Sequence, residues 1–325
     1  RFTSGDPTGG RFTFSSVAKL ATLTMVESQS DYLSPFLFGA VGNGSTDDAA
    51  AVWPVVLHGK GRIDARFKVG TTLAKTGSVD LRGPILDGRE YSTSDSIPAA
   101  LILGSGIGLT TSDALTLAGC AVIAKNAAQS EIVVGGLLTL DASALWGQVN
   151  TGVASLGTQA ITSTISKSLL TVAPLHAPNS TIMDSVVEGT GTYTIFSADQ
   201  IGLAGGPWEI VRTTIEENAQ IGIASIDSSS IVASYIEWSD GAVCNSSTVT
   251  PVDSASTSAT SGRFAIRGGA FTIPLSGAAG HVITVSDIPD GISFPWNGYG
   301  TLSMSNSVVG ISNGASSDQR LTADY

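Results

Sequence analysis

The heptapeptides IMDSVVE (residues 182–188) and IVRTTIE (residues 210–216) share the pattern that decides the expected fold. Each has an apolar residue, two variable residues, a Ser or Thr, one further residue, an Ile or Val, and a Glu. On a strand, the hydroxyl residue and the Ile or Val two positions later face the same side, whereas the first apolar residue stands at an odd offset. A bend is therefore expected inside the pattern, with small hydroxyl residues stacked beside stacked aliphatic ones.

The pattern without its final acid recurs along the chain with spacings typical of coils. Its six copies begin at Ala160, Ile182, Ile210, Ile231, Ile283 and Met304. The first four are 22, 28 and 21 residues apart and the last two are 21 apart, which matches one turn of a parallel β-helix with variable corner loops. Three further fits are out of step and are interpreted as chance matches; they begin at Ala21, Ile226 and Cys244.

The composition also favours short strands. Hydrophobic residues make up 42% of the 325 residues and charged residues 13%, with 38 glycines, so a large core and many tight turns are expected. Brief apolar segments predict strands at 79–81, 100–103, 115–117, 121–124 and 132–140. The predicted fold class is therefore all-β, a parallel β-helix. A β-sandwich is the structural alternative, but it does not explain the retained spacing.

The run FGAVGNGSTDD (residues 38–48) resembles the opening of bacteriophage tailspikes and of the wider pectate-lyase-like family. The matching positions are Phe38, Gly39, Ala40, Gly42, Gly44, Thr46, Asp47 and Asp48. In that family the run leads into a short helix that caps a right-handed β-helix. A helix start at 46–48 also follows from the capping preference of Thr and Asp, and Pro54 predicts that the helix is short or kinked.

The resemblance implies a biological setting. It implies a homotrimeric spike on the phage virion, assembled in the host cytoplasm, that recognises a bacterial surface polysaccharide. Residues 1–34 are then a virion-attachment segment that contacts tail or baseplate proteins, and residues 17–23 predict a short amphipathic helix or a tether. Residues 35–245 form the capped β-helix, and residues 246–325 form a Ser/Thr-rich loop with C-terminal coils or a trimerisation region. Members of the family include hydrolases, lyases and spikes without activity.

The acids that follow three consecutive copies suggest chemistry. Between residues 160 and 245 there are nine acids and two bases. Because adjacent coils stack about 4.8 Å apart, Glu216 and Glu237 at equivalent positions are predicted to form the carboxylate pair of an endo-glycosidase, in which repulsion keeps one member protonated. Glu217 and Asp240 are the next catalytic candidates. The alternative is that this acidic column is a solvated or subunit-interface face on a non-catalytic receptor-binding or structural spike.

Four further residues are predicted to bind glycan. Glu188 stands in the same column, Arg212 is the nearby base, and Trp208 and Trp238 flank the acids with flat faces that suit sugar rings. The alternative for both tryptophans is a place in the core or an interface. Since Arg212 is the one base near the acids, a neutral or weakly charged glycan is expected.

Other function classes are disfavoured. The net charge is −11, and the bases Lys60, Arg62, Arg66 and Lys68 form the one short basic cluster, so no nucleic-acid partner is expected. No segment has the unbroken apolar length of a membrane span. Neither a Ser-His-Asp triad, a metal-ligand cluster nor a cofactor motif is evident, and the two cysteines are expected to be small buried residues.

Overall fold

The computed structural model describes residues 2–6, 11–15, 20–24, 32–126, 128–150, 153–173, 175–177, 179–188, 203–204, 208–251, 257–260, 263–271, 275–277, 281–296, 300–313 and 320–323. The chain divides into two compact units, residues 1–161 and 162–325. Each unit is considered by itself below.

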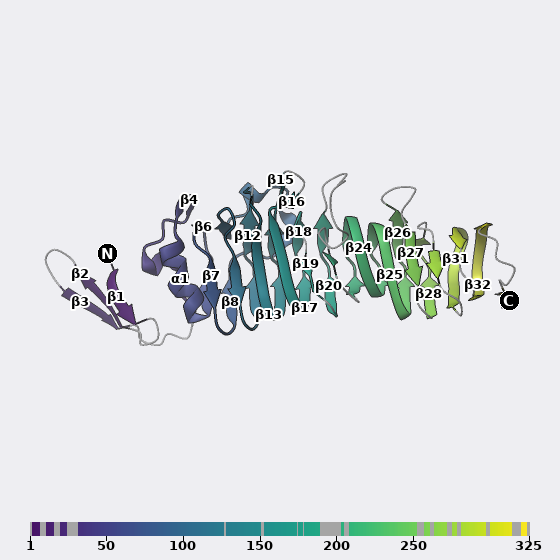
Figure 1. The fold of residues 1–325 in the computed structure, drawn as a ribbon, viewed down its shortest axis with the longest axis horizontal. Helices are drawn as coiled ribbons and strands as arrows, with labels where there is room; N and C mark the ends of the chain where they lie inside the picture. Colours follow the sequence, from purple (N-terminus) through teal and green to yellow (C-terminus); the bar gives the residue numbers. More distant parts are fainter. Residues whose placement is uncertain are drawn as a thin grey trace. The chain divides into compact units, whose positions relative to one another are not determined.

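Unit 1 is built almost entirely of short strands (Figure 1). Its elements are β1 (Phe2–Asp6), β2 (Arg11–Ser15), β3 (Leu20–Thr24), the 3-10 helix η1 (Pro35–Phe38), β4 (Asn43–Asp47), α1 (Ala49–His58), β5 (Lys60–Arg62), β6 (Arg66–Val69), β7 (Leu73–Lys75), β8 (Val79–Arg82), the 3-10 helices η2 (Gly88–Glu90) and η3 (Ser94–Ser96), β9 (Ala100–Leu103), β10 (Leu109–Thr111), β11 (Leu115–Ala118), β12 (Ala121–Ala124), β13 (Ser130–Asp141), β14 (Ala144–Trp146), β15 (Val149–Asn150) and β16 (Val153–Ala154). The five strands predicted from apolar segments are confirmed.

Residues 1–34 contain three described strands. β1, β2 and β3 form an antiparallel sheet in which β2 pairs with both neighbours. The helix considered for residues 17–23 is wrong over its described part, because Leu20–Thr24 is a strand. Residues 21–24, ATLT, alternate apolar and polar side chains with period two, which is the strand pattern. The predicted domain boundaries at residues 34 and 245 stay predictions.

Parallel ladders of identical or similar residues form the core of unit 1. Leu81, Leu117 and Leu140 are directly opposite one another on β8, β11 and β13, and all three are 0% exposed. Leu101, Val122 and Leu145 form a second such ladder on β9, β12 and β14. Burying an aliphatic side chain stabilises the folded protein by about 1.5–3 kcal/mol. The stacking of aliphatic residues on aliphatic residues therefore favours this strand register.

The run FGAVGNGSTDD forms a loop held by its own acids. Buried Asp48 accepts hydrogen bonds from the backbone N–H groups of Val41 (2.7 Å) and Gly42 (3.0 Å). Asp47 accepts from the N–H groups of Ala49 (3.0 Å) and Gly70 (2.9 Å), which joins the loop to the first turn of α1 and to the chain after β6. The predicted helix start is confirmed, and each of the two Asp residues stabilises the loop at its base.

α1 is short, as predicted, although Pro54 lies inside it. Val52, Val55 and Val56 are 0% exposed, so one face of the helix is fully buried. The helix ends at Gly59, whose φ of 91° is favourable for glycine and whose N–H bonds the carbonyls of Val55 and Val56. Within the described residues α1 is the single α-helix, and none of the helices has the length and apolarity to cross a membrane.

Unit 2 consists of strands that pair in parallel (Figure 1). Its strands are β17 (Leu156–Ser166), within which the division falls, β18 (Leu169–Thr171), β19 (Leu175–His176), β20 (Ser180–Met183), β21 (Val186–Glu188), β22 (Leu203–Ala204), β23 (Trp208–Val211), β24 (Thr214–Asp227), β25 (Ser230–Asn245), β26 (Thr248–Pro251), β27 (Thr257–Thr260), β28 (Arg263–Arg267), β29 (Ala270–Phe271), β30 (Leu275–Gly277), β31 (His281–Trp296), β32 (Gly300–Asn313) and β33 (Arg320–Ala323). Among the described residues, antiparallel pairs join β2 to β1 and β3 and join β15 to β16, whereas the other described pairings are parallel. The chain is therefore an all-β protein of mainly parallel strands.

Two apolar ladders run through unit 2 on either side of a bend. The first contains Ile165, Ile182, Ile210, Ile226, Cys244 and Ile266. The second contains Leu170, Val187, Ile215, Ile231 and Val249. Between the two stands a buried Ser or Thr, as the sequence pattern predicts. The residue before each hydroxyl has φ between 44° and 50°, which makes the expected bend.

The frame of the predicted repeat is partly wrong. The copies at Ile182, Ile210 and Met304 are in register, but those at Ala160, Ile231 and Ile283 are not. The matches at Ile226 and Cys244, interpreted as chance, are true members of the ladder. Successive buried hydroxyls are separated by 17, 28, 16 and 18 residues, so three of the four repeats are shorter than the expected 21 or 22 residues.

Candidate functional site

The bend between the two apolar ladders positions the predicted site residues of β21 and β24. At each bend, the hydroxyl donates to the carbonyl two residues earlier and accepts the N–H of the preceding bend. Ser185 donates to Met183 (2.7 Å) and accepts from Ser168 (3.1 Å); Thr213 repeats the arrangement with Val211 and Ser185. These side chains are buried and hydrogen-bonded to backbone groups. They therefore fix the residue at which each bend ends and the next strand begins.

Glu188 and Glu216 are brought together by this register. They are directly opposite each other at the ends of the parallel pairing between β21 and β24, where neighbouring strands are about 4.8 Å apart. Glu188 is half-buried and accepts a hydrogen bond from the Thr171 hydroxyl (3.1 Å), its neighbour on the other side. Glu216 is exposed. The result is a Thr–Glu–Glu row across three strands.

Glu237 is not part of this row. It lies opposite Gly222 of β24 and Ala259 of β27, and six positions of β24 separate residue 222 from residue 216. The predicted equivalence of Glu216 and Glu237 is therefore wrong. The physical reason is the short repeat of 16 residues between Thr213 and Ser229, which puts Ile231, rather than Ile236, beside Ile215.

The two other catalytic candidates are on the same strands. The backbone of Glu217 follows Glu216 in β24, and its side chain lies outside the described residues. Asp240 is exposed on β25, where it accepts the backbone N–H of Arg263 (2.9 Å) and pairs with the Arg263 guanidinium (3.5 Å). The backbone hydrogen bond, followed by the guanidinium charge, holds the pKa of Asp240 below its ordinary value. Asp240 is thus ionised at neutral pH, which suits a base and not a general acid.

Arg212 is occupied by an ion pair at the bend. Its Nε and Nη2 atoms bind the two carboxylate oxygens of Asp184 at 2.7 and 2.8 Å. Both residues have positive φ, 44° and 48°, and they occupy the same position of successive bends. The hydrogen bond to Asp184 raises the pKa of Arg212. The base predicted to bind glycan is therefore already neutralised by a neighbouring carboxylate.

Both tryptophans of the predicted site are in the core. Trp208 and Trp238 are each 0% exposed, and Trp238 packs against Phe264 with ring centroids 4.5 Å apart. The prediction that these rings offer flat faces to sugars is wrong, and the alternative that they fill the core is confirmed. A strand buries every second residue, and Trp208 shares its buried face with Ile210.

The Thr171–Glu188–Glu216 row can act chemically in two ways. Carboxylates accept hydrogen bonds from hydroxyl groups such as those of sugars, and two carboxyls about 5 Å apart are the separation of retaining glycosidases. Within the described residues, no group of three His, Cys, Asp or Glu side chains forms a metal site.

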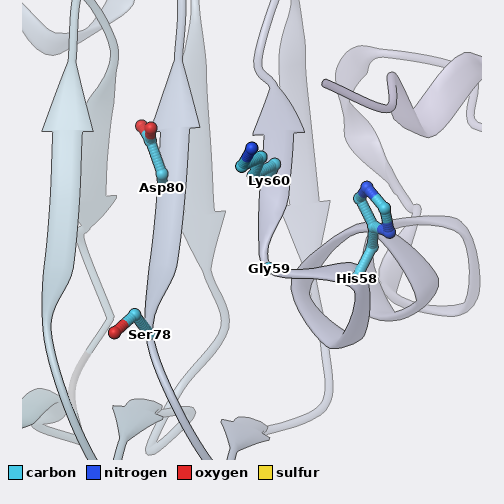
Figure 2. Close-up of a pocket in the computed structure, with 5 residues that line it drawn as sticks. All are labelled: His58, Gly59, Lys60, Ser78 and Asp80. Carbon is cyan, nitrogen blue, oxygen red and sulfur yellow. The ribbon is translucent and has the colours of Figure 1, made fainter. Parts of the chain in front are cut away.

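One pocket of unit 1 is not predicted from the sequence. It has a volume of about 390 Å³ and is lined by His58, Gly59, Lys60, Ser78 and Asp80 (Figure 2). Lys60 belongs to the basic cluster visible in the sequence, but Asp80 comes 20 positions later. The parallel register of β5 and β8 puts Lys60 opposite Asp80, and such a register has no local sequence signal.

Comparison with known proteins gives no relative: no protein-family model, no curated protein and no solved structure matches this chain.

Proposed function

We propose that this chain is a bacteriophage tailspike or tail-fibre protein that binds a host surface polysaccharide. In this proposal the parallel strands of each unit are coils of a right-handed β-helix, and the loop at residues 38–48 with α1 caps the coils of unit 1. Support comes from the in-register apolar ladders and buried hydroxyl bends of unit 2 and from the resemblance of the loop to the opening of tailspikes.

The observation that carries the proposed binding is the Thr171–Glu188–Glu216 row. Side chains at equivalent positions of parallel strands repeat about every 4.8 Å, and here two carboxylates are adjacent while the buried Thr171 hydroxyl donates a hydrogen bond to the Glu188 carboxylate. A line of acceptors suits the hydroxyl groups of a neutral polysaccharide. The acidic surface is less suited to a polyanion, because like charges repel.

Binding can be tested with a panel of purified capsular polysaccharides and lipopolysaccharides immobilised on a sensor. Glu188→Gln and Glu216→Gln remove charge but keep shape, and each is expected to weaken binding by about tenfold, as loss of a charged hydrogen bond does. Glu209→Gln is the matched control, because Glu209 is exposed on β23 in the same unit. Equal binding by all three variants would refute the assignment of the site.

Hydrolysis of the bound polysaccharide is a second candidate function, and the Glu188–Glu216 pair favours it. At the separation of neighbouring strands, one carboxyl could act as nucleophile and the other as acid and then base, with retention of configuration. The test is the size distribution of a bound polysaccharide after incubation. Released oligosaccharides that disappear in Glu188→Gln and Glu216→Gln are the expected result, whereas intact polymer would leave a purely binding spike.

The assembly belongs to the same proposal. We expect a homotrimer on the virion, with residues 1–34 attached to tail or baseplate proteins. The mass of the purified chain in solution tests the first part, and a monomer would contradict the tailspike assignment. A deletion of residues 1–34 is expected to leave polysaccharide binding intact and to abolish incorporation into virions.

A further inference from the structure

We propose that the pocket of unit 1 formed by His58, Lys60, Ser78 and Asp80 binds a hydroxy-carboxylate, such as a uronic acid. This inference goes beyond the proposed function, because it depends on unit 1 alone and holds whether or not unit 2 binds a polysaccharide. The pocket joins the end of α1 to strands β5 and β8.

The pocket has a fixed acceptor in Asp80. Its carboxylate accepts hydrogen bonds from the Tyr32 hydroxyl and from Nε and Nη2 of Arg82, the latter at 3.2 and 3.1 Å. The Arg82 guanidinium in turn lies over the Tyr32 ring, 4.9 Å from its centre. Arg82 Nε also lies 3.3 Å from Oδ2, so three of these four contacts are with Oδ2 and one is with Oδ1. Because each carboxylate oxygen offers about two acceptor positions, the position left for a ligand hydroxyl is on Oδ1.

A second acceptor is oriented in a similar way. The Ser78 hydroxyl donates its hydrogen to Asp113 (2.9 Å), which leaves the lone pairs of its oxygen for a donor. Ser78 and Asp80 are two positions apart on the chain and line the same pocket. Together they provide two acceptors, as neighbouring hydroxyls of a polyhydroxylated molecule require.

The other side of the pocket carries donors and positive charge. In Figure 2, Lys60 lies between Asp80 on the neighbouring strand and His58 at the end of α1. Both Lys60 and His58 are exposed, and an ammonium group and an imidazole are suitable donors to a carboxylate. A ligand with a carboxylate at one end and hydroxyls at the other therefore matches the two sides of the pocket.

Titration calorimetry of the full chain with sodium glucuronate tests the inference. Saturable binding is expected, with glucose at least about tenfold weaker because it lacks the charge, and with Lys60→Gln and His58→Gln each weakened by about tenfold. Lys167→Gln is the matched control, since Lys167 is exposed in unit 2. Absence of glucuronate binding, or unchanged binding in both pocket variants, would overturn the proposal.

Two further ligands define the chemistry. Methyl glucuronide mimics a uronic acid within a polymer and gluconate mimics a free hydroxy acid, so their relative affinities identify the source of the ligand. Inorganic phosphate that binds as tightly as glucuronate would overturn the hydroxyl part of the proposal. Glu188→Gln and Glu216→Gln are expected to leave glucuronate binding unchanged, which separates a failure of this site from a failure of the polysaccharide site.

Discussion

Single buried hydroxyls determine where the chain of unit 2 bends. Each one satisfies a carbonyl of its own repeat and an N–H of the preceding repeat, two groups that would otherwise be buried without partners. A Ser or Thr is required at these positions because an apolar residue of the same size offers neither bond. The hydroxyl therefore stabilises the bend and couples it to the next repeat.

Replacing Ser185 by Ala is expected to lower the free energy of unfolding by about 1–3 kcal/mol, the cost of leaving buried polar groups unsatisfied. Urea unfolding followed by tryptophan fluorescence measures the change. Ser305→Ala is the control, because Ser305 is an exposed residue of β32 and its replacement is expected to cost less than about 0.5 kcal/mol. Similar losses for both variants would contradict the role of the buried hydroxyl.

The thiols of Cys120 and Cys244 are expected to be unreactive in the folded protein. Burial raises the pKa of each thiol to about 12, so at pH 8 only about one molecule in ten thousand carries a given thiolate. Alkylation by iodoacetamide followed by mass spectrometry is expected to modify neither residue until denaturant unfolds the chain. Rapid modification in native buffer would contradict their burial.

At the scale of an element, the loop at residues 38–48 depends on glycines that differ in their surroundings. Gly42 has φ 68°, and an added Cβ would lie 2.6 Å from Cζ of Phe36. Gly39 has φ 87°, with nothing within 4 Å of such a Cβ. Both positions have the backbone strain of a left-handed residue, about 1–2 kcal/mol, and only Gly42 has the clash.

Gly42→Ala is therefore expected to destabilise unit 1 more than Gly39→Ala does. The difference isolates the contacts of the added Cβ with Phe36 and with Ala65, whose Cβ lies 3.1 Å away, because the backbone penalty is common to both variants. Thermal unfolding monitored by circular dichroism measures it, and a lower midpoint for Gly42→Ala is the expected result. Equal midpoints would mean that the loop moves away from Phe36 at little cost.

The register of β21 and β24 can be tested by cross-linking. Residues opposite each other on neighbouring parallel strands are about 4.8 Å apart, within the range of Cα separations for a disulfide. A Glu188→Cys/Glu216→Cys variant is expected to form a disulfide under mild oxidation, and a Glu216→Cys/Glu237→Cys variant is not. A disulfide in the second variant alone would restore the register predicted from the sequence and contradict the one described here.

That register also shows what the sequence can and cannot predict. The bend, the buried hydroxyls and the helix after Asp48 follow from local chemistry and are confirmed. The register of the repeats does not follow from local chemistry. The same pattern also fits a stretch inside strand β25 that begins at Ile231, and the repeat length varies from 16 to 28 residues. The residues at the bend itself, among them Lys167, Asp184 and Arg212, share a positive φ and no side-chain chemistry.

At the scale of the whole molecule, the sequence predicts the wrong pair of neighbouring acids for one candidate site and does not predict the other site. Glu188 and Glu216 were both identified, but their partnership depends on the strand register. The pocket of His58, Lys60, Ser78 and Asp80 depends on the pairing of β5 with β8, which joins residues about 20 positions apart. Burial of Trp208 and Trp238 likewise follows from which face of each strand is inside.

Hydrogen–deuterium exchange of the full chain with a bound polysaccharide tests the central claim most directly. The account predicts slower exchange in peptides that contain β21 (Val186–Glu188) and the start of β24 (Thr214–Asp227), where Glu188 and Glu216 are opposite each other. At the same polysaccharide concentration this protection is expected to be reduced in Glu216→Gln and unchanged in Glu209→Gln. Unchanged exchange rates in both strands while the polysaccharide is bound would contradict the assignment of this row as the binding site.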